Sequence, residues 1–162
     1  NGDVGEVMRF EGTTSYVRFD GRELLPVLVE GALLAVGMLV LVGWATGNIF
    51  DGQTGGSPLS FVEKIVMACG AGFHEEIVFR VFLFAGGAPL GDFSAALVAA
   101  LVSSLIFSGA HYVGAMGDAP DLVSFTFRAI AGLYLAAVYR YRGFAVAVYT
   151  HTIYDLLVFF FI

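Results

Sequence analysis

Long apolar segments joined by short polar connections make up most of this chain. Five of these segments are each long enough to cross a bilayer core, which takes roughly 20 helical residues. They cover about residues 24–45, 61–84, 93–113, 122–139 and 143–162. Inside a bilayer every backbone polar group must find a partner, and a helix provides one within the segment. The pattern predicts an all-α, polytopic membrane bundle of about five transmembrane helices.

Polar stretches mark the ends of these segments. The connections contain glycine and proline, as in "GGAPLGD" and "GAMGDAPD". Ser60 and Asp121 each follow a proline-containing turn and have the side chains that begin helices. Residues 1–23 are polar, glycine-rich and mixed in charge, so we expect an N-terminal arm, either a hairpin or an interfacial segment, before a transmembrane domain at 24–162.

Composition agrees with a chain that lies in lipid. Hydrophobic residues make up 58% of the 162 positions and charged residues 14%, against roughly 45–50% and 25% in soluble domains. A soluble helical protein of this length could not shield five such helices from water, so the bilayer itself is the expected partner. No run of Lys or Arg exists, which argues against nucleic-acid binding. The single cysteine excludes an internal disulfide and a Cys-rich metal site.

Basic residues indicate an orientation. Outside the apolar segments they occur only before the first segment and between the fourth and fifth, whereas the opposite connections carry Asp51, Asp118 and Asp121. The positive-inside rule then predicts that the N-terminus and the 140–142 loop lie in the cytoplasm.

Ionisable residues inside apolar segments are costly and usually mark a function. Segment 61–84 contains "GFHEEIVFR", in which Glu76 and Arg80 are four apart and share a helix face. Glu75 is turned by about 100° from Glu76 and faces elsewhere, over the small residues Ala71 and Gly72. We expect Arg80 to hold Glu76 while Glu75 faces a cavity. The alternative is that both acids neutralise Arg80.

Two later segments supply histidines. His111 ends a polar stripe with Ser104 and Ser108, and His151 shares a face with Asp155, four residues on. Each histidine alone fits a packing role. Together, two histidines and two carboxylates from three helices suit general acid–base chemistry on water. The same donors also suit zinc, and the residue types leave both readings open.

Three short motifs, each on a long apolar segment, resemble one family. "EEIVFR" at 75–80 is similar to EExxxR, "FSGAH" at 107–111 to FxxxH, and "HTIYD" at 151–155 to HxxxN/D. In this order they resemble the CAAX prenyl protease type 2 family, also called the CPBP or Abi intramembrane protease family, over a catalytic core at about residues 60–160.

The resemblance implies an intramembrane endopeptidase that cleaves membrane-associated or lipidated protein substrates. It implies that Glu75 activates water with help from His111, and that His151 and the residue at 155 stabilise the oxyanion. Glu76 and Arg80 would form the supporting pair. Many members have Asn where this chain has Asp155, and an ionised Asp cannot donate a hydrogen bond.

Asp155 keeps a zinc-dependent version open, with Glu75, His111, His151 and Asp155 as its ligands. A non-catalytic scaffold, such as a bacteriocin self-immunity protein, is the alternative from another class.

Overall fold

The computed structural model describes residues 5–10, 13–17, 21–47, 59–87, 93–114 and 117–161. Near the N-terminus, β1 (Gly5–Phe10) and β2 (Thr13–Val17) form an antiparallel hairpin, one of the two arrangements expected for the arm. Asp51, one of the acids used to predict the orientation, lies outside the described residues.

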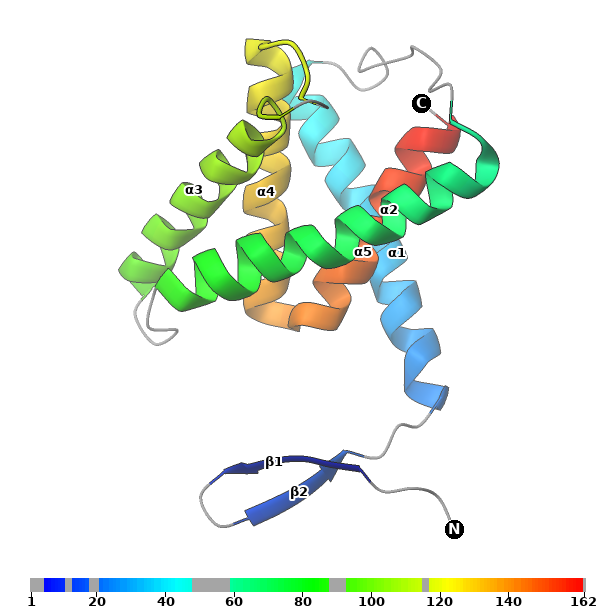
Figure 1. Cartoon of the computed structure of the whole chain (residues 1–162), viewed down its shortest axis with the longest axis vertical. Helices are drawn as coiled ribbons and strands as arrows, with labels where there is room; N and C mark the ends of the chain where they lie inside the picture. Colours follow the sequence, from blue (N-terminus) through cyan, green and yellow to red (C-terminus); the bar gives the residue numbers. More distant parts are fainter. Residues whose placement is uncertain are drawn as a thin grey trace.

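Five α-helices form most of the rest of the described chain, which confirms the all-helical membrane bundle. They are α1 (Gly21–Thr46), α2 (Phe61–Glu76), α3 (Phe93–Ala110), α4 (Leu122–Arg142) and α5 (Phe144–Phe161). A π-helical segment, η1 (Ile77–Ala85), directly continues α2. Successive helices run in alternate directions, and α2 with η1 crosses the others obliquely (Figure 1).

Four of these helices are long and apolar enough to cross a membrane, at Leu24–Thr46, Phe93–Ala110, Leu122–Arg142 and Phe144–Phe161. Their outer faces carry large exposed apolar side chains, among them Leu33, Trp44 and Phe93, each at least 70% exposed. Such a surface would aggregate in water, and lipid is the solvent that it fits. The chain is a multi-pass integral membrane protein.

The two predicted helix starts are confirmed. Ser60 precedes α2 and forms a capping box, in which its hydroxyl accepts from the Glu63 amide and the Glu63 carboxylate accepts from the Ser60 amide. Asp121 precedes α4 and accepts a hydrogen bond from the Ser124 amide at 2.7 Å.

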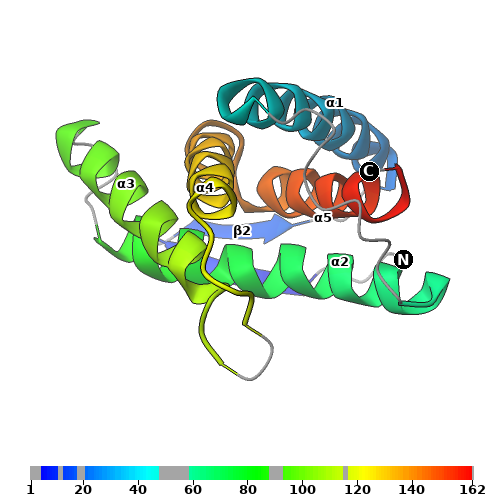
Figure 2. The same ribbon diagram turned by 90° about the horizontal axis from the view of Figure 1, so that it is seen from above.

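Helix α5 packs between α1 and α2, as the view from above shows (Figure 2). Two glycines permit the close approach. A Cβ atom on Gly72 of α2 would lie 2.2 Å from Thr152 Oγ1, and one on Gly31 of α1 would lie 2.9 Å from Tyr149 Cβ. Small residues at helix contacts bring the backbones together, as is common in membrane bundles. The contact at Gly72 places α5 beside the acidic pair one turn further along α2.

Candidate active site

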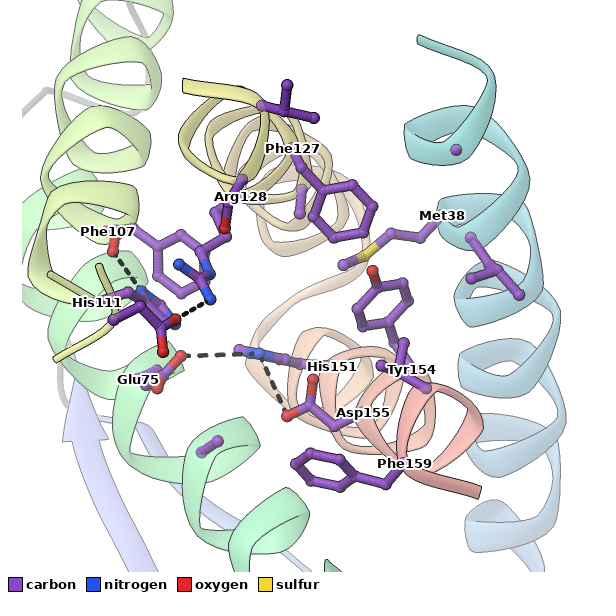
Figure 3. A pocket seen from close by; sticks show the side chains of 18 of the residues that line it. Met38, Glu75, Phe107, His111, Phe127, Arg128, His151, Tyr154, Asp155 and Phe159 are labelled. Carbon is purple, nitrogen blue, oxygen red and sulfur yellow. Dashed lines mark hydrogen bonds and ion pairs between the residues drawn. The ribbon is translucent and has the colours of Figure 1, made fainter. Parts of the chain in front are cut away.

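A cavity of about 700 Å³ opens among the helices and is lined by half of the polar residues singled out inside the apolar segments. Its walls come from all five helices and from the connection before α4 (Figure 3). Glu75 of α2, His111 after α3, and His151 and Asp155 of α5 all line it. The structure therefore brings the four predicted catalytic residues to one space.

Glu76 does not line the cavity but lies fully buried beside it. One of its oxygens, Oε2, is 3.1 Å from Arg80 Nε, as the spacing of four residues predicts. The other, Oε1, accepts a hydrogen bond from His151 Nδ1 at 2.9 Å. Glu76 thus links the arginine on its own helix to the histidine on α5, and the second of these contacts was not predicted from the sequence.

Arg80 is a buried charge with three kinds of support. Besides Glu76, its guanidinium donates to the Gly132 carbonyl of α4 at 3.4 Å and lies 4.8 Å from the centre of the Phe107 ring. A cation over an aromatic face is stabilised by the ring's quadrupole. Arg80 falls within η1, and π-helical turns are frequent at functional sites. The arginine therefore joins η1 to α3 and α4 behind the site.

The second ring nitrogen of His151, Nε2, faces two more carboxylates. Its Nε2 lies 3.7 Å from Glu75 Oε2 and 3.7 Å from Asp155 Oδ2. These are ion-pair distances, too long for hydrogen bonds. The Glu75 side chain is 29% exposed and that of Asp155 20%, whereas His151 is 6% exposed. Glu75 and Asp155 thus flank the histidine while keeping access to the cavity.

His111 is held differently. Its Nδ1 donates to the Phe107 carbonyl at 2.9 Å, since a carbonyl oxygen can only accept. Its ring meets that of Phe107 edge to face at 5.0 Å, and Phe107 also meets the His151 ring at 6.0 Å. Because Nδ1 carries the hydrogen, Nε2 is an acceptor in the neutral ring. His111 and Glu75 share the cavity, and Phe107 contacts both histidines.

The donor atoms do not converge as a zinc site requires. Among the described residues, no group of three or more His, Cys, Asp or Glu side chains is placed to hold a metal ion. A tetrahedral zinc site needs its ligands at about 2.0–2.2 Å from one centre. The present arrangement of these side chains therefore does not fit a zinc ion.

Comparison with known proteins identifies a family. The family model for the type II CAAX prenyl endopeptidases described as Rce1-like matches residues 57–157, more than half of the chain. The chain belongs to this Rce1-like family. No curated protein and no solved structure matches it.

The matched region of this Rce1-like chain contains all three motifs and also cavity residues that sequence reasoning missed. Arg128 and Tyr154 line the cavity. Arg128 is the one charged residue in the apolar segment 122–139, and that isolation was the available signal. Tyr154 lies within "HTIYD" and adds polarity around His151 and Asp155, but it was given no role. The serines of the α3 stripe face α4 instead, since Ser108 donates to the Phe125 carbonyl at 2.7 Å and Ser104 packs on Gly132.

Proposed function

We propose that this protein is an intramembrane endopeptidase that hydrolyses a peptide bond in membrane-associated or lipidated protein substrates. Membership of a prenyl endopeptidase family supports peptide hydrolysis. The observation that carries the proposal is the convergence of Glu75, His111, His151 and Asp155 on one cavity among the helices. A cavity bounded by apolar helices suits a substrate that reaches it from the lipid.

In this mechanism Glu75 is the general base. Its carboxylate takes a proton from water, the water oxygen attacks the scissile carbonyl carbon, and the proton is then passed to the leaving amine nitrogen. His111 assists by accepting a hydrogen bond from the water at Nε2, because its Nδ1 is already committed to the Phe107 carbonyl. Both residues line the cavity, and the mechanism requires that they share one bound water.

His151 is the proposed oxyanion donor. In its doubly protonated form it donates Nδ1–H to Glu76 and keeps Nε2–H for the oxygen that becomes negative. Asp155, 3.7 Å from Nε2, stabilises that positive ring without accepting its hydrogen bond. Glu76 and Arg80 are positioning residues, since they act through His151 and the packing behind it.

The N-terminal arm and residues 140–142 are proposed to lie in the cytoplasm, with the transmembrane domain at 24–162 carrying the activity. Residues 140–142 were expected to form a loop, but they are the end of α4, and Gly143 alone separates α4 from α5. The start of α1 and the α4–α5 junction lie at the same end of the bundle (Figure 1). Arg142 pairs there with Glu30 of α1, its Nη2 donating to Oε2 at 2.8 Å. The acids Asp118 and Asp121 lie at the opposite end of α4, in keeping with the positive-inside rule.

The direct test compares wild type with Glu75→Gln. The amide cannot take a proton from water, so we expect cleavage of membrane substrates to fall by roughly 10²–10⁴-fold. Comparing the protein termini of membranes from cells carrying either form would identify the substrates. Helical circular dichroism and gel filtration in detergent should be the same for both. Identical sets of termini in the two strains would favour a non-catalytic scaffold.

A second measurement addresses the zinc-dependent alternative. With Glu75 as the base and no metal ligand set, we expect the purified protein to keep its activity after exhaustive chelation. Elemental analysis of the same sample reports whether zinc is bound in stoichiometric amount. Activity that disappears with the chelator and returns with zinc, but not with magnesium, would establish a metal-dependent enzyme.

A further inference from the structure

Arg128 is a charged residue on the cavity wall that the proposed chemistry does not use. Among the described residues that line the cavity, it is the only arginine or lysine. Its Nη2 donates to Asp118 of the connection before α4, and the Tyr112 ring lies 5.4 Å from its guanidinium carbon. Its Nη1 is buried and has no hydrogen-bond partner among the described residues.

The two side chains of the Arg128–Asp118 ion pair differ in how far they are exposed. The Arg128 side chain is 14% exposed, whereas that of Asp118 is 53% exposed. A guanidinium binds a carboxylate most strongly through two parallel hydrogen bonds. Asp118 engages one nitrogen and leaves Nη1 unsatisfied, which is costly for a buried group. The arginine is therefore fixed in the wall, while its acid partner can move away into solvent.

We propose that Arg128 binds a carboxylate of the substrate, which takes the place of Asp118. This inference rests on the proposed endopeptidase function. It assigns the part of the site that positions the substrate relative to Glu75. The carboxylate can be the free end of the substrate chain or an acidic side chain.

Electrostatic repulsion by the acidic side chains of the cavity favours a position beside Arg128 for the substrate carboxylate. Glu75 and Asp155 lie on the walls opposite Arg128, around His151 (Figure 3). An anionic group is repelled by Glu75 and Asp155 and attracted by the guanidinium, so it is kept away from the reacting centre. Two further carboxylates line the cavity: Asp118, which the anionic group replaces, and Asp121, which accepts the Ser124 amide at the start of α4. Holding one end of the substrate at Arg128 then decides which peptide bond reaches Glu75.

Binding can be measured apart from turnover in a Glu75→Gln background. The probe is an S-farnesylated Cys-Ala-Val-Leu peptide labelled with a neutral BODIPY dye, which has no carboxylate, and it is prepared with a free C-terminal carboxylate or with a C-terminal amide. A third peptide, Cys-Ala-Val-Asp amide, carries its only carboxylate on a side chain. Fluorescence anisotropy with the full chain in nanodiscs gives the three dissociation constants. The third peptide tells a terminal carboxylate from a side-chain one.

We expect the acid peptide to bind at least about tenfold more tightly than the amide, as a charged hydrogen-bonded pair allows. In Arg128→Gln the two should bind alike, and Arg128→Lys should keep only part of the preference because it lacks the planar fork. Asp118→Asn removes the competing carboxylate, so it should tighten binding of the acid peptide several-fold and leave the amide unchanged. This gain cannot come from misfolding.

Equal binding of acid and amide peptides by the parent chain, or no binding of either, would overturn the proposal. A preference that survives in Arg128→Gln would also overturn it. The two proposals fail separately. Discrimination through Arg128 without any cleavage by wild type would remove the protease function alone, whereas cleavage without discrimination would remove the carboxylate site alone.

Discussion

Glu75 and Glu76 are adjacent in the chain and occupy opposite environments. Glu76 is completely buried and has two partners, Arg80 at 3.1 Å and His151 at 2.9 Å. Glu75 is 29% exposed, lines the cavity, and approaches His151 only to 3.7 Å. One carboxylate is held by the protein, and the other is left available to a ligand. The comparison shows how a repeated residue type can divide structural from chemical work.

Helix geometry and one close contact produce this division. A step of one residue turns the side chain by about 100°. Gly72 allows Thr152 of α5 against α2, so His151 comes between the two acids and contacts each differently. The alternative interpretation was that both acids neutralise Arg80. The geometry does not fit it, because Arg80 pairs at 3.1 Å with Glu76 while Glu75 faces the cavity.

The sharpest test of the comparison is Glu76→Gln beside Glu75→Gln. Glu76→Gln leaves Arg80 buried without its counter-charge, which should lower the free energy of unfolding by about 3–5 kcal/mol. It should also lower activity, because His151 loses the carboxylate at Nδ1. Glu75→Gln should lower activity alone, since its side chain has access to the cavity.

Thermal melts of both variants in the same detergent, with peptide turnover measured in parallel, separate the two effects. Equal losses of melting temperature in the two variants would contradict the division of roles.

A smaller effect is expected when the contact that brings α5 to the acids is widened. A Cβ on Gly72 would lie 2.2 Å from Thr152 Oγ1, so Gly72→Ala should destabilise the protein by about 1–3 kcal/mol through overpacking. It should also lower turnover, because α5 carries His151. Gly70→Ala is the matched control on the same helix, since nothing lies within 4 Å of its Cβ position.

Melting temperature and turnover in nanodiscs report both quantities. If Gly70→Ala and Gly72→Ala behave alike, the contact at Thr152 does not set the geometry of the site.

The smallest effect should come from His74, the next residue before the acidic pair. Its ring is exposed, and its Nδ1 donates to the Gly70 carbonyl one turn back on the same helix at 2.9 Å. We expect His74→Ala to change the free energy of unfolding by less than about 0.5 kcal/mol, as for most exposed positions. Turnover should be unchanged in the same assay. A large loss of turnover would move the boundary of the site to include this residue.

Much of the fold could be predicted because its signals are local. The apolar segments match the described helices closely, and Ser60 and Asp121 begin helices as their side chains indicate. The pairing of Glu76 with Arg80 also follows from one helix, through the spacing of four residues. The hydrogen bond between Glu76 and His151 joins residues 75 positions apart, and no spacing within one helix predicts it.

The amino-acid sequence by itself determined the membrane bundle, the family and the short list of polar residues, since helix periodicity and hydropathy act over a few residues. Only the tertiary structure decided their partners. It brought Phe107 into contact with Arg80 and the two histidines, joined Glu76 to His151, and paired Arg128 with Asp118 on the cavity wall. Such contacts depend on how closely two helices approach, and in this protein a glycine facing a threonine sets that distance for α2 and α5.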